Sequence, residues 1–195
     1  YRFRWRVRNP WGLSFWLSAG AGFLLAALPM MLSGPATNPV QQWDPSFHMN
    51  GVWTINHVGD GQMGSGLDQA FPEGSPTNYP LGWHIFTALF TVPKTVVLGS
   101  NASTLALILL WVVGAGAYTR VLFPSKTARL AAPVVAGGML SMPGDALMAY
   151  SQWPNATSVA FLPGIAALMV LLGRQMLAGA QGVRPRRTRR FVAQS

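Results

Sequence analysis

The sequence predicts an all-α protein, a multi-pass transmembrane helical bundle with one long external loop that contains short interfacial helices. Half of the 195 residues are hydrophobic and only 10% are charged, whereas soluble domains carry about 25% charged residues. Several segments reach the ~20 apolar residues that a helix needs to cross a bilayer. The acidic residues lie in two polar stretches, while most basic residues lie at the ends of apolar segments.

The net charge of +9 does not indicate nucleic acid binding. The arginines gather where the positive-inside rule places them, at the cytoplasmic ends of membrane segments. The absence of cysteine excludes disulfides, thiolate metal sites and cysteine nucleophiles. We therefore expect a plasma-membrane protein that contacts membrane lipids, with no nucleic acid partner.

The first part of the chain divides into three segments. Residues 1–10 are basic and should stay in the cytoplasm, and residues 11–32 are apolar and long enough to span. Residues 33–101 form the external loop, because Ser33 to Pro80 is rich in Gly, Pro, Asn and Asp. The apolar segment 81–97 contains Lys94 and is short before Pro93. If it spanned, every later loop would invert, so we predict an interface-lying or re-entrant helix there.

The second part of the chain carries three more predicted transmembrane helices within residues 102–177, at residues 102–123, 130–150 and 158–177. Pro133 and Pro143 should break the second helix, and Pro163 should break the third. This order delivers the basic tail, residues 178–195, to the cytoplasm.

The first motif of the loop reads Trp43-Asp44-Pro45-Ser46-Phe47-His48. Asp followed by Pro predicts a helix from about Pro45 to about Val58 with Asp44 as its N-cap. Asp44 and His48 are four residues apart and should meet near the first turn. Phe47, Val52 and Ile55 should help form an apolar surface that can lie at the membrane.

Structural alternatives to a site stay open for these residues. Asp44 can serve only as a helix cap, and His48 and His57 can be interfacial histidines. A carboxylate and an imidazole at this spacing can also bind a divalent metal, although two ligands are a weak signal.

The second motif reads Asn78-Tyr79-Pro80-Leu81-Gly82-Trp83-His84. Gly82 allows close backbone approach, and Trp83 suits the membrane interface. His84 lies in an apolar run and is costly unless it faces a polar cavity, so it is a site candidate. A hydrogen-bonded structural histidine is the alternative.

Three further acidic residues are less informative. Asp60 and Asp68 belong to a Gly-rich segment without the strand–loop–helix context of a phosphate-binding loop. We expect this segment to be a flexible loop with solvated charges. Asp145, beside Pro143 and Gly144, can cap a helix or line the external cavity.

The two motifs together, Trp43-Asp44-x-x-Phe47-His48 and Tyr79-Pro80-x-x-Trp83-His84, resemble an uncharacterised actinobacterial multi-pass membrane family. That family is usually placed near the GT-C membrane glycosyltransferases, which use polyprenyl-phosphate sugars. Tyr118-Thr119-Arg120-Val121-Leu122-Phe123 is similar to the cytoplasmic end of a helix in related mannosyl- and aminoarabinose-transferases. The resemblance covers residues 11–177 and implies that the chain is an N-terminal or middle part of a larger enzyme.

The resemblance implies an inverting sugar transfer from a polyprenyl-phosphate donor to a cell-envelope glycan or glycolipid. Asp44 would be the general base that takes the proton of the acceptor hydroxyl. The other implied substrate-binding residues are His48, Tyr79, Trp83, His84 and Lys94. A divalent metal is an open possibility.

Two non-enzymatic readings remain. A scaffold subunit of a cell-envelope assembly would use Asp44 only as a cap. A polyprenyl-lipid transporter would need charged or polar residues along several spans, and the spans here carry few.

Overall fold

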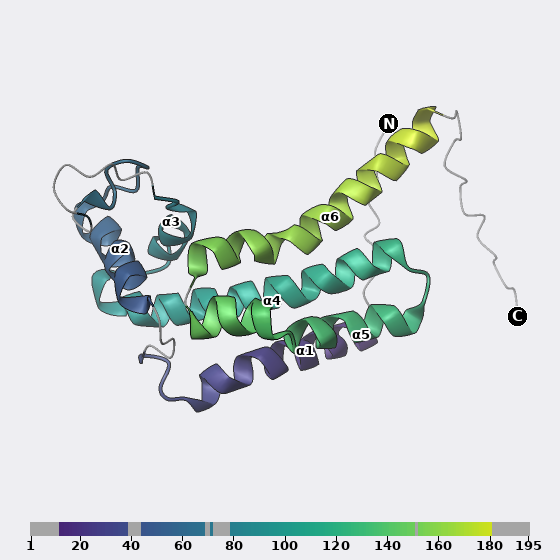
Figure 1. Ribbon diagram of the computed structural model, residues 1–195, viewed down its shortest axis with the longest axis horizontal. Helices are drawn as coiled ribbons and strands as arrows, with labels where there is room; N and C mark the ends of the chain where they lie inside the picture. The colour runs from purple at the N-terminus through teal and green to yellow at the C-terminus, as the bar shows by residue number, and fades with distance from the viewer. Residues whose placement is uncertain (1–11, 39–43, 69–70, 72–78, 151, 181–195) are drawn as a thin grey trace, which may run out of the picture.

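The computed structural model describes residues 12–38, 44–68, 71, 79–150 and 152–180. These residues form helices and turns and contain no strand, which confirms the all-α prediction (Figure 1). The elements in chain order are α1 (Leu13–Leu32), α2 (Pro45–Val58), α3 (Gly82–Ala88), the 3-10 turn η2 (Pro93–Thr95), α4 (Val96–Leu122), α5 (Lys126–Gly137), the π-helical segment η3 (Leu140–Ala149) and α6 (Trp153–Ala180).

Four segments are long and apolar enough to cross a membrane, as predicted: Leu13–Leu32, Pro93–Leu122, Lys126–Ala149 and Trp153–Leu177. The last three begin earlier than the sequence analysis predicts. The second span begins earlier because its first part is polar in sequence and yet helical and buried. Ser100, Asn101, Ser103 and Thr104 are all buried within α4. The amide of Asn101, for example, donates to the carbonyls of Ala36 and Asn38.

Segment 81–97 does not cross the bilayer as one helix, which agrees with the sequence analysis. Its first part is α3, whose seven residues extend only ~10 Å at 1.5 Å per residue. Its last part, from Pro93, already belongs to the next span. The predicted loop 33–101 is therefore too long at its C-terminal end.

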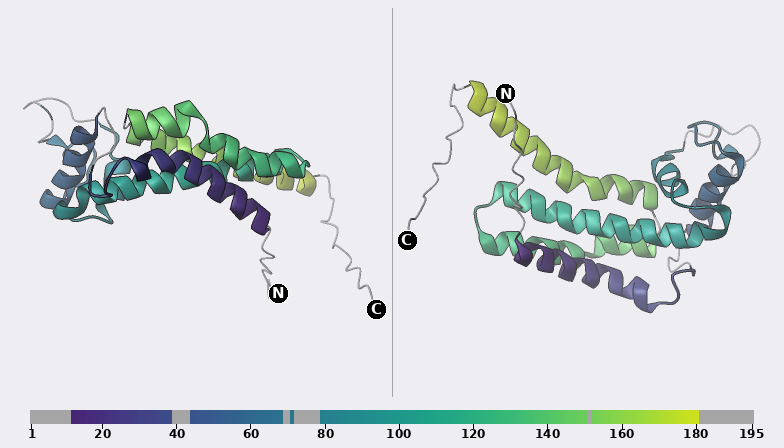
Figure 2. Two further views of the ribbon diagram at one scale, coloured as in Figure 1. Left: turned by 90° about the horizontal axis from the view of Figure 1, so that it is seen from below. Right: turned by 180° about the vertical axis from the view of Figure 1, so that it is seen from behind.

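Successive spans run in opposite directions, with α4 at the centre (Figure 1). Helices α1 and α5 pack together on one side of α4, and α6 packs on another side. Both α2 and α3 lie at one end of this bundle, together with the N-terminal end of α6 (Figures 1 and 2). We call α2, the loop 59–68 and α3 the cap. The N-terminal end of α1, the α4–α5 connection and the C-terminal end of α6 lie at the opposite end.

The described charges divide between these two ends. The acidic side chains belong to the cap and η3: Asp44, Asp60, Asp68 and Asp145. Except for Lys94 on η2, the described basic side chains lie at the opposite end: Arg120, Lys126, Arg129 and Arg174. The two basic termini, 1–10 and 181–195, and Glu73 fall outside the described residues.

Glycines allow α1 and α5 to approach backbone to backbone. A Cβ atom on Gly22 would overlap the carbonyl oxygen of Pro133, and one on Gly137 would overlap the carbonyl of Gly22. The hydroxyl of Ser18 also donates to the carbonyl of Leu130. Small residues at such crossings are the usual packing device of membrane helices, because lipid provides no hydrophobic drive for association.

Two predicted proline breaks are wrong. Helix α5 continues through Pro133, and α6 continues through Pro163. Neighbouring helices can compensate the hydrogen bond that a proline removes, and α1 packs closely against Pro133. The predicted break at Pro143 is confirmed: within η3 the backbone at Met142 is non-helical and the Met142–Pro143 bond is cis.

Candidate functional site

The cap brings together four of the six predicted site residues in one cluster of rings. The centroid of the His48 ring lies 5.1 Å from that of His84, 5.9 Å from Trp83 and 6.2 Å from Tyr79. His48, Trp83 and His84 are at most 3% exposed, and Tyr79 is half-buried. We call these four residues, with Phe47 and Trp153, the histidine cluster.

The local sequence explains how α2 delivers His48. Asp44 and Pro45 start the helix as predicted, and Gly59 ends it with a left-handed φ of 76°. Gly51, one turn after His48, faces the same way. A Cβ atom at Gly51 would lie 2.9 Å from the His84 ring, so only glycine lets the two helices meet at this distance.

The two histidines form a buried hydrogen bond. Nδ1 of His48 lies 3.1 Å from Nε2 of His84, so one nitrogen carries the proton and the other accepts it. Burial lowers the pKa of His48, and the charge of Asp44 acts in the opposite direction. Burial also lowers the pKa of His84 to about 3, with a further contribution from His48, against a smaller raising effect of the Pro80 carbonyl. Both rings are therefore neutral near pH 7.

Two nitrogen atoms in this cluster lack a well-aligned hydrogen-bond partner. They are Nδ1 of His84 and Nε1 of Trp83. Buried groups of this kind usually have a partner. The cluster therefore contains two buried polar nitrogens that its own side chains do not pair.

Trp153 belongs to the cluster although the sequence analysis did not select it. Its ring stacks on Trp83 with centroids 4.4 Å apart and lies 5.5 Å from His48. Its Nε1 donates to the carbonyl of Leu147 on η3. A Trp-Pro pair at the start of an apolar segment was the available signal, but the sequence does not say which rings it meets.

Asp44 lies at the edge of the histidine cluster. It occupies the N-cap position of α2 and is half-buried, yet its side chain makes no capping hydrogen bond. Its charge raises the pKa of Tyr79, after the larger effect of burial, and it acts on His48 in the same sense. The carboxylate is thus close to the cluster and is not engaged in capping.

The apolar surface predicted for α2 faces inward rather than toward lipid. Val52 is fully buried and Ile55 is 8% exposed. Phe47 packs edge-on against Tyr79 at 5.2 Å and against Phe71 at 5.7 Å. The apolar face predicted for α2 is present, but it packs against the rest of the cap.

The remaining candidates lie away from the histidine cluster. Lys94 is exposed on η2, beyond the end of α3, and no hydrogen bond or ring contact of the described residues joins it to the cluster. His57 is exposed and stacks on Trp53 at 4.6 Å. Asp68 and Asp145 are also exposed. The structure therefore does not bring Lys94 into the same site as the other five residues.

The loop 59–68 is more structured than the sequence analysis predicts. The carboxylate of Asp60 accepts hydrogen bonds from the Gln62 amide at 2.8 Å and from the Ser65 hydroxyl at 2.6 Å. The Ser65 bond, and then the Gln62 bond, lower the pKa of Asp60. Leu67 is 1% exposed and anchors the loop in the cap. Asp60 is thus an organiser of this loop rather than a freely solvated charge.

Polar side chains fix α3 between α2 and α4. Thr87 and Ser103 share a hydrogen bond of 3.0 Å between hydroxyls. The Asn56 amide and the Thr91 hydroxyl share one of 2.8 Å. A Cβ atom on Gly99 would overlap the Thr91 side chain, so α4 must carry glycine there. These contacts fix the position of α3, which carries Trp83 and His84 of the second motif, relative to α2 and α4.

No group of three or more His, Cys, Asp or Glu side chains in the described ranges is arranged to hold a metal ion. The facing nitrogens of His48 and His84 are used by each other. The predicted pairing of Asp44 with His48 as metal ligands therefore has no third ligand in this part of the chain.

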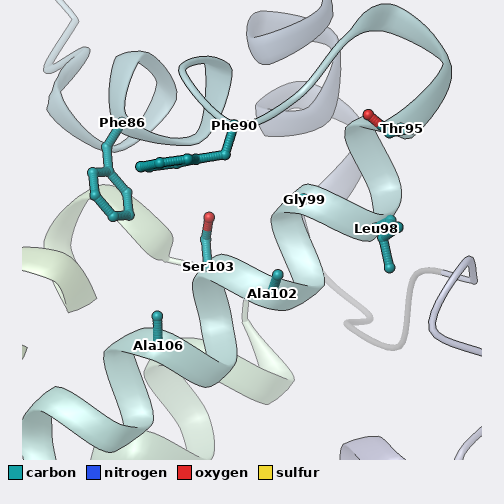
Figure 3. Close-up of a pocket in the computed structure, with 8 residues that line it drawn as sticks. All are labelled: Phe86, Phe90, Thr95, Leu98, Gly99, Ala102, Ser103 and Ala106. Atoms are coloured by element: carbon teal, nitrogen blue, oxygen red, sulfur yellow. The ribbon is translucent and has the colours of Figure 1, made fainter.

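An apolar groove of about 470 Å³ lies between α4 and the segment formed by α3 and the turn that follows it (Figure 3). Phe86 of α3 and Phe90 in the turn after it lie over a strip of small residues on α4. Besides these rings, its lining consists of Thr95, Leu98, Gly99, Ala102, Ser103 and Ala106. None of the six predicted site residues lines the groove.

A family model described as "Family of unknown function (DUF6541)" matches residues 2–193, so the chain belongs to this family. No curated protein and no solved structure matches the chain.

Proposed function

We propose that this DUF6541 protein is the N-terminal or middle part of an integral membrane glycosyltransferase. It moves a sugar, with inversion, from a polyprenyl-phosphate donor to a cell-envelope acceptor at the outer face of the plasma membrane. One observation carries this proposal: a half-buried carboxylate, Asp44, that does not cap its helix lies beside a polar cluster of rings.

Asp44 is the general base in this mechanism. It accepts the proton of the acceptor hydroxyl while that oxygen attacks the anomeric carbon, and the polyprenyl phosphate leaves from the opposite face. A carboxylate whose oxygens are not used in capping keeps its acceptor capacity for that proton. Tyr79 and the imidazoles of His48 and His84 orient the acceptor.

The leaving phosphate needs cationic stabilisation more than it needs a proton. Lys94 is the one described lysine or arginine side chain at the cap end, and it is exposed. The cations that hold the phosphate therefore come largely from parts of the enzyme outside the described residues. The apolar groove beside α3 also supports the proposal, because it suits the hydrocarbon chain of a polyprenyl donor that enters from the membrane.

A non-catalytic scaffold subunit is the second candidate. It is favoured by the mutual hydrogen bond and deep burial of His48 and His84, which suit a structural role. In that case the cluster fixes the shape of the cap for a partner, and Asp44 carries no chemistry.

The test is sugar transfer from radiolabelled polyprenyl-phosphate sugars in membranes that contain the full-length protein. Asp44→Asn should lower transfer by about 100-fold or more, the usual effect of a lost general base. Asp145→Asn is the matched control, since Asp145 is an exposed acid at the same end of the bundle. Equal transfer in Asp44→Asn and wild type would remove Asp44 from the chemistry. No transfer by the wild type with any donor would favour the scaffold.

A further inference from the structure

A small pocket lies at the end of the bundle opposite the cap, where the proposed glycosyl transfer does not reach. It has a volume of about 130 Å³ and is formed by the N-terminal end of α1, the last turn of α4 and the first turn of α5. Figure 2 shows these three helix ends at the same end of the molecule. Three of its lining residues are basic: Arg120, Lys126 and Arg129.

The stretches of sequence that form this pocket carry no acidic residue. The sequence has no Asp or Glu in residues 1–43, 74–144 or 146–195. The four described acidic residues lie toward the other end of the bundle. Three cations around one cavity repel one another, and an anion bound among them would relieve that repulsion.

Arg129 is held in place without using all of its donors. Its Nε donates to the Phe123 carbonyl at 3.1 Å, and its Nη2 donates to the Pro124 carbonyl at 2.8 Å. A guanidinium has five N–H donors, so three lie outside these two bonds. The carbonyls of the α4–α5 connection thus hold the Arg129 guanidinium group in place, and a guanidinium group can bind two phosphate oxygens at once.

Backbone groups add to the positive potential of the pocket. Both α1 and α5 begin there, and helix N-termini carry unpaired N–H groups and the positive end of the helix dipole. The backbone at Gly12 is open, because only the Ser14 hydroxyl, 3.9 Å away, lies near a Cβ built there. An anion can therefore approach the start of α1 closely.

We propose that this pocket binds the phosphate group of an anionic lipid headgroup from the adjacent leaflet. Its volume equals that of roughly four water molecules at ~30 Å³ each, enough for one phosphate group. Phe15 and Leu130, which also line it, give it an apolar wall that continues into the bundle. Basic pockets between membrane helices on the cytoplasmic side bind such headgroups, and the positive-inside rule places this end in the cytoplasm. Free phosphate shares this chemistry.

The test uses the purified full chain in nanodiscs that contain phosphatidylcholine and phosphatidylglycerol, with retained lipid counted by native mass spectrometry. Arg120→Gln/Lys126→Gln should lower the retention of phosphatidylglycerol by about fivefold for each removed cation. The control Lys94→Gln/Arg174→Gln removes the same charge from residues that do not line the pocket. It should change retention by less than about twofold.

Each outcome decides the proposal. A loss confined to the pocket variant, and not reproduced by excess inorganic phosphate, supports the headgroup site. Displacement of the lipid by inorganic phosphate, with direct binding seen by calorimetry, overturns the headgroup in favour of a free phosphate. Equal losses in the two double variants, or no preference for phosphatidylglycerol in the wild type, overturn the site altogether. If the pocket variant does not fold, Lys126→Gln alone repeats the test, because Lys126 is exposed.

Discussion

The cap and the four-span bundle are held together by different chemistry. Helices α1 and α5 of the bundle meet backbone to backbone at Gly22 and Gly137, through contacts that depend on a close fit of shape. The cap instead buries polar rings and hydroxyls, with His84 fully inaccessible and hydrogen-bonded to His48. The stability of the bundle should therefore respond to added side-chain volume, whereas the cap should respond to protonation and to lost hydrogen bonds.

Among the substitutions, the largest expected effect is on the bundle, from Gly22→Ala. The added methyl would overlap the Pro133 carbonyl, and backbone cannot move aside as a side chain can. We expect the free energy of unfolding to fall by about 3 kcal/mol, the upper range for overpacking. Reversible unfolding in mixed micelles, followed by circular dichroism, measures it.

Gly20→Ala on the same helix is the matched control, since nothing lies within 4 Å of a Cβ at Gly20. It should leave stability unchanged or raise it slightly, because alanine favours helix over glycine. Equal effects of the two substitutions would contradict shape-dependent packing of α1 against α5.

The corresponding glycine-to-alanine substitution in the cap is Gly51→Ala, and its effect on stability can be compared with that of Gly22→Ala. Gly51→Ala would place a Cβ atom 2.9 Å from the His84 ring and from Leu67. These are side chains that can give way, so we expect a loss of about 2 kcal/mol together with a weaker near-ultraviolet dichroism of the stacked Trp83 and Trp153. Gly82→Ala, with no neighbour within 4 Å, should change neither quantity.

Acid should loosen the cap before it affects the bundle. The folded-state pKa of His84 is lowered from 6.5 to about 3, so the unfolded state binds a proton that the folded state refuses. Stability is complete above pH 6.5 and falls as the pH drops toward about 3. The loss is on the order of 1.4 kcal/mol per pH unit for this fully buried ring.

The near-ultraviolet dichroism of the tryptophan stack should therefore fade on acidification while the far-ultraviolet helix signal persists. His57→Gln should not alter this titration, because His57 is exposed outside the cluster. Simultaneous loss of both signals would show that cap and bundle unfold as one unit.

The smallest effect is expected from Asn56→Ala, which removes the hydrogen bond to Thr91. A buried hydrogen bond of this kind contributes about 1 kcal/mol. The melting temperature should fall by a few degrees, and amide exchange should speed up in α3 more than in α1. Uniform acceleration in both helices would argue against a local anchor.

The sequence alone determined the all-α membrane architecture, because a bilayer demands long apolar helices and segregated charge. It also determined helix α2, whose start at Pro45 and end at Val58 agree with the prediction, because local Asp-Pro and Gly signals act over a few residues. It selected His84 as a candidate, since an imidazole in an apolar run is costly without a polar partner, whereas His48, Tyr79 and Trp83 were candidates through the resemblance of the two motifs.

Only the tertiary structure decided which of these residues meet. The packing of α2, α3 and α6 pairs His48 with His84 and places Trp153 in the histidine cluster. It also leaves Lys94 exposed outside the cluster. The helical start of α4 was hidden for a similar reason. Its Ser103 shares a hydrogen bond with Thr87, 16 residues away, and its Asn101 donates to the carbonyls of Ala36 and Asn38, 65 and 63 residues away. Contacts over such separations leave no local pattern in the sequence.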